Sequence, residues 1–419
     1  MRFRSQIGTA VAIQGIGAGA ALLASILISR RYGPAVQGWY ASSRSWIDLA
    51  GQVAVLGLPQ AFTHALSSGS LTVLEAAHIS SALIAVLLLI AAACTKAGII
   101  ELFAAAGMLA ATIHLLFRPL VLAARPSPVF NLVSIFPNIC LLLGAFLITL
   151  SGRSDVQVLI AGSFSCGAIL TVAVIGAGLP RRLSGWASSP EVWRLVKYGC
   201  WSSITPLALQ ATITGTYQIL TVSPNGPVLA GLFSLPVLLT MSATLPLNMV
   251  APLLFKRWAA DFTGERSTTN FSTTARYAAV LSLAATPVLF FGSILFLTRV
   301  FGPRFEPAIA PCLVLSCSTY GFLMSRLLGT ALLAFDSPRW YALCSIARAA
   351  VIFLLLWAGW QRSLVGCALS WAVGDSVAFL LSAIGIARVT GISIWDAAGL
   401  PFVEKRSMSQ RNLRHEIAV

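Results

Sequence analysis

The sequence predicts an all-α polytopic membrane protein, with twelve transmembrane helices in two parallel six-helix repeats around a central cavity. Three observations lead to this prediction. Hydrophobic residues make up 57% of the 419 residues and charged residues only 10%, with a mean hydropathy of +0.85, whereas soluble domains carry about 25% charged residues. Apolar runs of roughly 20 residues, the length that crosses a bilayer, follow one another along the chain. The third observation is an octapeptide that occurs twice.

The repeated octapeptide reads Gly-Pro-x-x-x-Gly followed by an apolar and an aromatic residue, and it stands at 33–40 and 226–233. Three further pairs share its offset of 193 residues (226 minus 33): Arg4 with Lys197, Pro59 with Pro252 and Phe62 with Phe255. Matches on one offset across roughly sixty residues predict a unit duplicated in tandem. Glycine and proline suit a tight turn, so the motif itself is interpreted as structural.

The predicted spans follow from the apolar runs, and the first of them is long enough to remain as a helix rather than a cleaved signal peptide. In order they cover 8–28, 38–61, 75–95, 99–124, 128–150, 155–178, 198–220, 228–254, 276–298, 306–334, 339–360 and 364–387. Because each half holds an even number of spans, both halves enter the membrane from the same side. We expect an N-terminal six-helix lobe at 1–190, a C-terminal six-helix lobe at 191–387 and a basic cytoplasmic tail at 388–419. Within the first span, Gly15 and Gly19 predict a close approach of another helix.

Basic residues at the helix ends predict the orientation. Of the 28 lysines and arginines, three lie deep within spans, seven lie on one side of the membrane and the remaining eighteen lie on the side that holds both termini. Basic residues favour the cytoplasmic side, so we expect both termini in the cytoplasm. The net charge of +15 is therefore attributed to topology and to contact with membrane lipids, and no nucleic-acid partner is expected.

Six charged residues within the spans are the candidate substrate-binding residues. A charge near the bilayer centre costs about 2.5–3.5 kcal/mol on insertion scales, so it normally faces other helices or a wet cavity. Two interpretations remain open: structural ion pairs that hold the bundle together, or a positively biased cavity, since arginine matches phosphate oxygens in bidentate geometry. The six residues are Arg44 and Asp48, which lie on one helix face and can pair, with Arg326, Arg348, Asp375 and, nearer a helix end, Arg118.

Several motifs do not occur in the sequence, and they bear on enzymatic function. There is no Walker A sequence, no HExxH or GxSxG motif and no cysteine–histidine cluster. The loops are too short to hold a catalytic domain. An enzyme is therefore not expected, and neither is a cofactor or metal, apart from H⁺ or Na⁺ as a coupling ion.

The beginning of the chain resembles that of a known family. The first span followed by Ser29-Arg30-Arg31-Tyr32-Gly33-Pro34 and then Gly38-Trp39-Tyr40 is similar to the R-x-L-G-P-x-x-x-G-x-Y pattern of Wzx-type polysaccharide flippases, with Tyr32 in place of leucine. The stretch 300–306, the turn at 336–338 and the segment 365–368 look like the second half of that family. The resemblance covers residues 1–390 and extends to the whole multidrug/oligosaccharidyl-lipid/polysaccharide exporter (MOP) superfamily.

The resemblance implies two six-helix lobes around a cation-lined cavity in the inner membrane of a bacterium. It implies a flippase that moves an undecaprenyl-pyrophosphate-linked oligosaccharide to the periplasmic leaflet, in contact with other polysaccharide assembly proteins. Three alternatives stay open: a drug/cation antiporter of the same superfamily, a major-facilitator transporter, and a non-transporting membrane partner of a polysaccharide assembly complex. The loop at 67–74 lacks the charged motif of major-facilitator proteins, which disfavours the second.

Overall fold

The structure is a computed structural model. It describes residues 2–400 apart from 68–70, 99, 153–154, 178–188 and 336, and within the segment 245–264 it describes only residues 247, 251, 254 and 258. These described residues form helices and no strands, which confirms the all-α prediction. The helices of the first half are α1 (Arg2–Ala54), α2 (Leu58–Ser67), α3 (Val73–Lys96), α4 (Leu102–Ala124), α5 (Ser127–Ser151) and α6 (Val156–Gly176).

The second half is built in the same way. Its helices are α7 (Ser189–Thr221), α8 (Gly226–Ala243), α10 (Glu265–Phe296), α11 (Ile309–Ala334), α12 (Pro338–Trp357), α13 (Leu364–Thr390) and α14 (Ile394–Ala397). The short turns η1 (Leu297–Phe301), η2 (Pro303–Ala308) and η3 (Trp360–Arg362) lie where the chain reverses between long helices.

Helix α1 contains the first predicted span and most of the second. Gly33 divides it with φ 83° and ψ −175°, a conformation that costs glycine little because it has no Cβ. Pro34 then opens the next helical segment, where its missing N–H is no loss. Within the described chain, ten helical segments are long and apolar enough to cross a membrane. With α1 counted twice and the long but more polar α7 added, the helices account for the twelve predicted spans.

Several boundaries differ from the prediction, and two of the differences have a clear origin. The second span was expected to run to residue 61, but α1 ends at Ala54 and Leu56 and Gly57 turn the chain with positive φ before α2 begins. Gly57 allows this turn to pack directly on the backbone of Gly199 in α7. Helix α10 begins at Glu265 rather than 276 because a mainly polar segment of about three turns extends it beyond the apolar run. The end of the predicted span 228–254 lies mostly outside the described residues.

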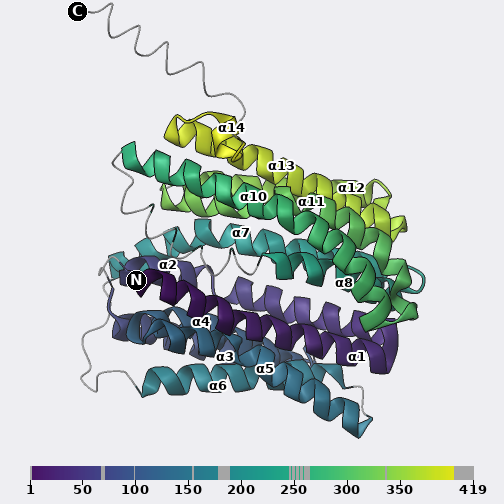
Figure 1. The fold of residues 1–419 in the computed structure, drawn as a ribbon. Coiled ribbons are helices and arrows are strands. Elements are labelled where there is room, and N and C mark those ends of the chain that lie inside the picture. The colour runs from purple at the N-terminus through teal and green to yellow at the C-terminus, as the bar shows by residue number, and fades with distance from the viewer. Residues whose placement is uncertain are drawn as a thin grey trace, which may run out of the picture.

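The helices run side by side, and the N-terminus lies at the same end of the bundle as α14 (Figure 1). Helices α1–α6 occupy one side of the molecule, α10–α13 occupy the other, and α7 and α8 lie between them. Each side has its own core of fully buried side chains, around Phe62, Leu116 and Leu120 in the first and Trp258, Phe271 and Phe335 in the second. Ala41 of α1 joins a further cluster with Phe233 and Trp371, which ties the two sides together.

The two copies of the repeated motif touch each other. A Cβ on Gly38 would collide with the backbone oxygen of Pro227, and a Cβ on Gly231 would collide with that of Pro34. These two contacts are related by the offset of the repeat, so α1 and α8 cross where neither helix has a side chain. The structure thereby supports a structural role for the motif.

The predicted close approach at Gly15 and Gly19 was wrong. A Cβ at either position would meet nothing within 4 Å, whereas Gly17 lies against Ile135 of α5. The reason is helical phase, because Gly15 is exposed and Gly17 is buried on the opposite face.

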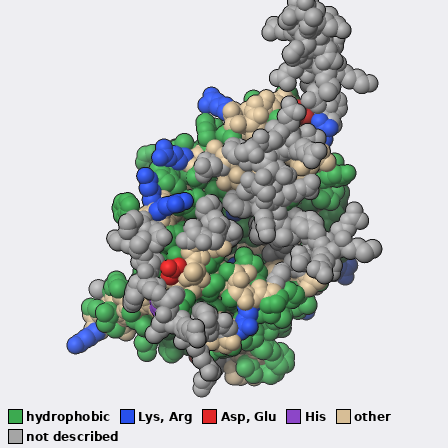
Figure 2. All heavy atoms as spheres, turned by 90° about the vertical axis from the view of Figure 1, so that its left-hand side faces the viewer, with side chains coloured by type: hydrophobic (Ala, Val, Ile, Leu, Met, Phe, Trp, Pro, Cys, Tyr) green, Lys and Arg blue, Asp and Glu red, His purple; other side chains and the backbone are tan. Residues whose placement is uncertain are grey.

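Figure 2 views the end of the bundle that holds the N-terminus, and basic side chains lie around the described part of this face. The order of the helices along the chain places the following basic residues at or towards this end of the bundle: Arg125, Arg194, Lys197, Arg276, Arg339 and Arg388. One of them is paired, since Arg276 contacts Asp396 of α14 at 3.0 Å.

Candidate functional site

Arg44 is the centre of a polar cluster in the first half. Its Nη1 donates to the Tyr40 hydroxyl at 2.9 Å, its Nη2 donates to Asn138 Oδ1 at 3.3 Å, and its Nε lies 3.9 Å from Asp48 Oδ2. The predicted pairing of Arg44 with Asp48 is confirmed, but at a distance typical of a loose ion pair. Both side chains are partly exposed, at 30% and 37%. The charges of this Arg44 cluster (Tyr40, Arg44, Asp48 and Asn138) are therefore accessible within the bundle.

A seam of uncharged hydrogen bonds joins α1 to α7 beside the Arg44 cluster. Ser45 O accepts from Gln210 Nε2 at 3.1 Å and from Thr214 Oγ1 at 3.0 Å. Gln218 Nε2 donates to Ser42 Oγ at 3.1 Å. Nearer the Gly33 end, Gln37 of α1 donates to Ser234 of α8 at 3.1 Å. We call these contacts the α1–α7/α8 seam, and they hold the two halves together along the molecular centre.

Arg348 and Asp375 form a buried ion pair in the second half. Arg348 Nε donates to Asp375 Oδ1 at 2.6 Å, and the two side chains are 8% and 1% exposed. The guanidinium also lies over the rings of Phe322 and Trp371, 5.7 and 5.3 Å from their centroids. Two buried atoms, Arg348 Nη2 and Asp375 Oδ2, have no hydrogen-bond partner among the described residues. The two aromatic rings therefore add cation–π contacts to the ion pair.

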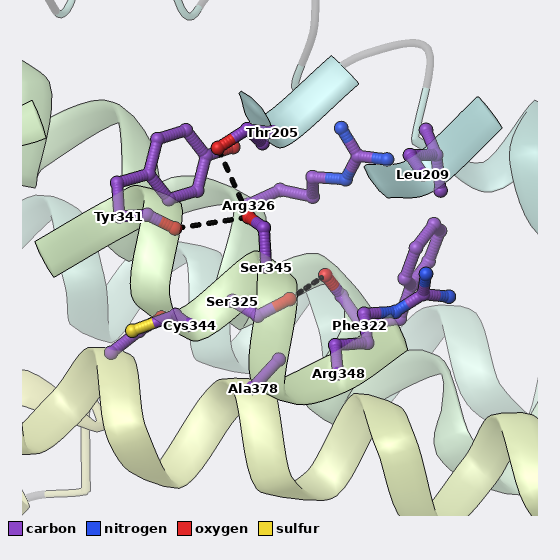
Figure 3. A pocket seen from close by; sticks show the side chains of 11 residues that line it. Thr205, Leu209, Phe322, Ser325, Arg326, Tyr341, Cys344, Ser345, Arg348 and Ala378 are labelled. Atoms are coloured by element: carbon purple, nitrogen blue, oxygen red, sulfur yellow. Dashed lines mark hydrogen bonds between the residues drawn. The ribbon is translucent and has the colours of Figure 1, made fainter. Parts of the chain in front are cut away.

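A small pocket opens beside this ion pair, and Arg326 and Arg348 both line it (Figure 3). Its volume is about 30 Å³, which admits one or two occupants of water size at ~10–15 Å³ each. The Arg326 guanidinium lies 5.3 Å from the centroid of Phe322, so one ring contacts both arginines. The lining is otherwise rich in hydroxyl groups, from Thr205, Ser325, Tyr341, Ser345 and Ser382.

The hydroxyl groups of this Arg326 pocket are partly committed to one another. Ser345 Oγ lies 3.0 Å from both Thr205 Oγ1 and Tyr341 O, and Ser325 Oγ donates to Phe322 O at 2.8 Å. Since Ser345 has a single hydroxyl hydrogen, it donates either to Tyr341 O or to Thr205, and in the first case Thr205 donates to Ser345. Thr205 lies on α7, so the pocket is built from four helices of the second half.

The structure thus divides the six candidate residues into three places. Arg326, Arg348 and Asp375 meet at the Arg326 pocket, and Arg44 and Asp48 meet in the first half. Arg118 stands apart, with its guanidinium 5.0 Å from the centroid of Phe130 in α5. The nearby His114 hydrogen-bonds to Thr171 at 2.9 Å.

The polar residues that accompany these charges were not predicted. Tyr40, Asn138, Gln210 and Gln218 complete the Arg44 cluster and the seam, and Gln14 donates to Asn131 of α5 at 3.3 Å. One signal was present in the sequence, since Asn131 and Asn138 are seven residues apart and therefore lie on one helix face.

No protein-family model matches the sequence, and no curated protein matches it. The structure, however, matches solved transporters over nearly its whole length. It is similar to an inward-facing multidrug resistance MATE family transporter of the MOP superfamily, with a TM-score of 0.67 and 13% identity over 91% of this chain and 98% of the other. An outward-facing structure of such a transporter matches with a TM-score of 0.68 and 12% identity, over 92% and 96%. The MATE multidrug transporter DinF-BH matches with a TM-score of 0.67 and 14% identity, over 93% and 96%.

The chain therefore has the fold of the MATE multidrug transporters of the MOP superfamily, and it is a multi-pass membrane protein. The expected twelve-helix architecture is confirmed by this likeness. The expectation of a MOP-type fold is confirmed as well, but the structural neighbours are multidrug transporters rather than polysaccharide flippases.

Proposed function

We propose that this protein is a membrane transporter that moves small amphipathic compounds by alternating access between its two halves. One observation carries the proposal: the structure matches a MATE transporter in its inward-facing and in its outward-facing conformation with TM-scores of 0.67 and 0.68. A scaffold close to both conformations fits a mechanism in which the halves rock about their interface. The α1–α7/α8 seam is the interface that would open and close.

The charges of the interior favour neutral or anionic compounds over cations. Asp375, the most buried acidic residue of the described chain, is already neutralised by Arg348. Arg44 and Arg326 contribute positive charge, against which Asp48 is the accessible acid. A cationic drug would need a net acidic or aromatic site, whereas an anionic or neutral amphiphile meets no such conflict.

A second candidate is the flipping of a lipid-linked oligosaccharide. The excess of arginine favours it, because arginine suits a pyrophosphate. The segments at 29–40 and 300–306 favour it as well, because they resemble segments of polysaccharide flippases. The Arg326 pocket, at about 30 Å³, is too small in this conformation for a glycan and equally for a drug-sized compound, which needs about 300–1,000 Å³, so its size does not distinguish the candidates. The MATE likeness supports the first candidate better. Other polysaccharide assembly proteins would be partners only under this second candidate.

The proposal also covers the membrane location, the orientation and the coupling ion. Basic helix ends at the end of the bundle that holds the N-terminus support an orientation with both termini in the cytoplasm. A location in the inner membrane of a bacterium follows only from the resemblance to polysaccharide flippases. A coupling ion, H⁺ or Na⁺, would drive the conformational cycle. Asp48 is the acid best placed to respond to it, since its carboxylate is only loosely paired.

The test is transport by purified full-length protein in proteoliposomes under an H⁺ or a Na⁺ gradient. We expect neutral and anionic fluorescent amphiphiles to cross faster than a cationic one. Arg44→Gln should lower the rate about tenfold, the effect of ~1.4 kcal/mol of lost interaction. The matched control is Arg388→Gln, which removes an arginine that stacks on Trp340 in the last turn of α13 and should transport normally.

Two outcomes would redirect the proposal. Folded protein that moves none of the amphiphiles under either gradient would contradict it. Movement of a labelled undecaprenyl-pyrophosphate glycan between leaflets, without movement of the amphiphiles, would favour the second candidate instead.

A further inference from the structure

A groove lies between α4, α5 and α6 at the end of the bundle that holds the N-terminus. Its volume is about 380 Å³, within the range of about 300–1,000 Å³ that ligand sites occupy. The residues that line it are Arg125, Pro126, Val129, Ala173, Val174 and Ala177. Arg125 is the one charged residue among these six, and the other five are apolar. The groove therefore suits a ligand that is apolar along most of its length and anionic at one end.

The groove opens toward the lipid-facing surface of the first half. Helix α6 lies at the edge of the molecule (Figure 1). Ile169 is four residues before Ala173 and lies on the same face of α6, where it is 69% exposed. Leu122 of α4, three residues before Arg125, is 37% exposed. Exposed apolar side chains on a spanning helix face hydrocarbon, so the apolar wall continues from the groove toward the middle of the bilayer.

The ends of the three helices place Arg125 at the membrane surface. Helix α4 ends at Ala124, α5 begins at Ser127 and α6 ends at Gly176. Spanning helices are about as long as the hydrocarbon core is thick, so their ends lie beside the lipid headgroups. Ala173 lies about one turn deeper. The charged end of the groove is thus at the level of the phosphate groups, and its apolar walls are at the level of the acyl chains.

The contacts of Arg125 leave part of its guanidinium open. Its Nε and Nη2 both donate to Val174 O, at 3.3 and 3.1 Å. That carbonyl lies in the last turn of α6, where the helix itself supplies no donor. Arginine has five N–H groups, and Arg125 forms no ion pair with a residue that the structure describes. Helix α6 therefore fixes one edge of the guanidinium, and within the described chain its charge and its Nη1 group remain available to a phosphate oxygen.

We propose that this groove binds an anionic phospholipid, with the phosphate group at Arg125 and the upper part of an acyl chain between Val129 and Ala173. A basic pocket between spanning helices at the membrane surface is suited to an anionic headgroup. A zwitterionic lipid would bring a cationic group to the same arginine and fits less well. Binding of the lipid does not depend on the proposed transport function, and it is measurable on protein that is not transporting.

The experiment measures the melting temperature of the purified full-length protein in a nonionic detergent as phosphatidylglycerol is added. A ligand that binds the folded state raises the melting temperature, and the dependence on ligand concentration gives an apparent dissociation constant. We expect a saturable rise with phosphatidylglycerol and a smaller rise with phosphatidylcholine of the same acyl chains. Inorganic phosphate, which has the charge but no acyl chain, should cause no rise.

Two variants test the two parts of the groove. Arg125→Gln removes the charge and keeps a side chain that can donate to Val174 O, so the apparent dissociation constant for phosphatidylglycerol should rise about fivefold, which corresponds to ~1 kcal/mol. Ala173→Phe fills the groove and leaves Arg125 in place, so the response to phosphatidylglycerol should be lost. Ala173 is exposed, and this variant is therefore expected to fold.

The matched control is Arg388→Gln. Arg388 is an exposed arginine at the same end of the bundle, but it does not line the groove. This variant should respond to phosphatidylglycerol as the unmodified protein does, and an equal loss in Arg388→Gln and Arg125→Gln would reduce the effect to general attraction and contradict the site.

Three other results would overturn the proposal. They are an equal response to the two lipids, an unchanged affinity in Arg125→Gln, and a full response in Ala173→Phe. If residues 178–188 of this chain filled the groove instead, the melting temperature would not depend on the headgroup, which is the first of these results. A rise with inorganic phosphate equal to that with phosphatidylglycerol would assign Arg125 to a soluble anion and not to a lipid.

Discussion

At the scale of the residue, the two acidic residues of the interior differ in how firmly they are held. Asp375 has one short ion pair and almost no exposure, whereas Asp48 lies 3.9 Å from its arginine and is 37% exposed. Buried ion pairs add little net stability relative to apolar residues, but removing one partner leaves the other charge buried and unpaired. Asp375 is therefore bound to the scaffold, and Asp48 is free to exchange partners.

The first prediction concerns the buried pair. Asp375→Ala or Arg348→Ala should each lower the free energy of unfolding by about 3–5 kcal/mol, because the remaining charge loses its partner. The double variant Arg348→Met with Asp375→Leu should recover most of that loss. Denaturant titration in detergent measures all three variants, and a double variant no more stable than the singles would contradict the expectation.

At the scale of the element, the glycines show what packing adds to a sequence pattern. Gly38 and Gly231 are in backbone contact across two helices, while Gly15 and Gly19 have open space on the side where a Cβ would point. Gly15 and Gly19 are spaced four residues apart, and Gly38 and Gly231 each end a Gly-Pro-x-x-x-Gly segment. Only the helical phase and the position of the neighbouring helix distinguish them.

The second prediction uses this difference. Gly38→Ala and Gly231→Ala should each destabilise the protein by about 1–3 kcal/mol, because the helices must separate to admit a methyl group. Gly15→Ala and Gly19→Ala should be neutral or stabilising by up to about 1 kcal/mol, since alanine favours the helix. Thermal unfolding of the four variants measures the contrast. Equal effects at all four positions would refute the importance of the crossing.

Much of the fold could be predicted from the sequence, because apolar runs and bilayer thickness leave few choices. The break at Leu56 and Gly57 could not, since it depends on contact with Gly199, far along the chain. The candidate site was harder to predict. Charged residues such as Arg348 stand out in apolar spans, but Asn138 and Gln210 matter only through the helices that face them.

At the scale of the whole molecule, the seam determines which motions are possible. Hydrogen bonds from Gln210, Thr214 and Gln218 of α7 to α1 must break if the halves separate along this line. These bonds are uncharged, and each contributes only about 0.5–1.5 kcal/mol net. A polar seam of this kind holds one conformation without making it permanent.

The third prediction tests whether the seam opens during transport. Cysteines at positions 42 and 218, in a variant without the native cysteines, should be joined by a short thiol cross-linker, because Ser42 and Gln218 are in contact at 3.1 Å. Cross-linking should abolish transport, and reduction should restore it. A pair at 345 and 205, which are in contact within the second half, is the control and should transport when joined. Undiminished transport by the cross-linked 42/218 protein would show that the seam stays closed.

The reciprocal contact between the two Gly-Pro segments also bears on the origin of the chain. Gly38 meets Pro227 as Gly231 meets Pro34, which is the self-complementary pattern of an interface between two identical subunits. The repeat predicts a six-helix ancestor, and in such an ancestor one surface would have bound its own copy, with no second kind of partner. After duplication and fusion, the two copies would have been free to diverge around this contact. Arg44 and Val237, which are separated by the offset of the repeat, are one place where the halves differ.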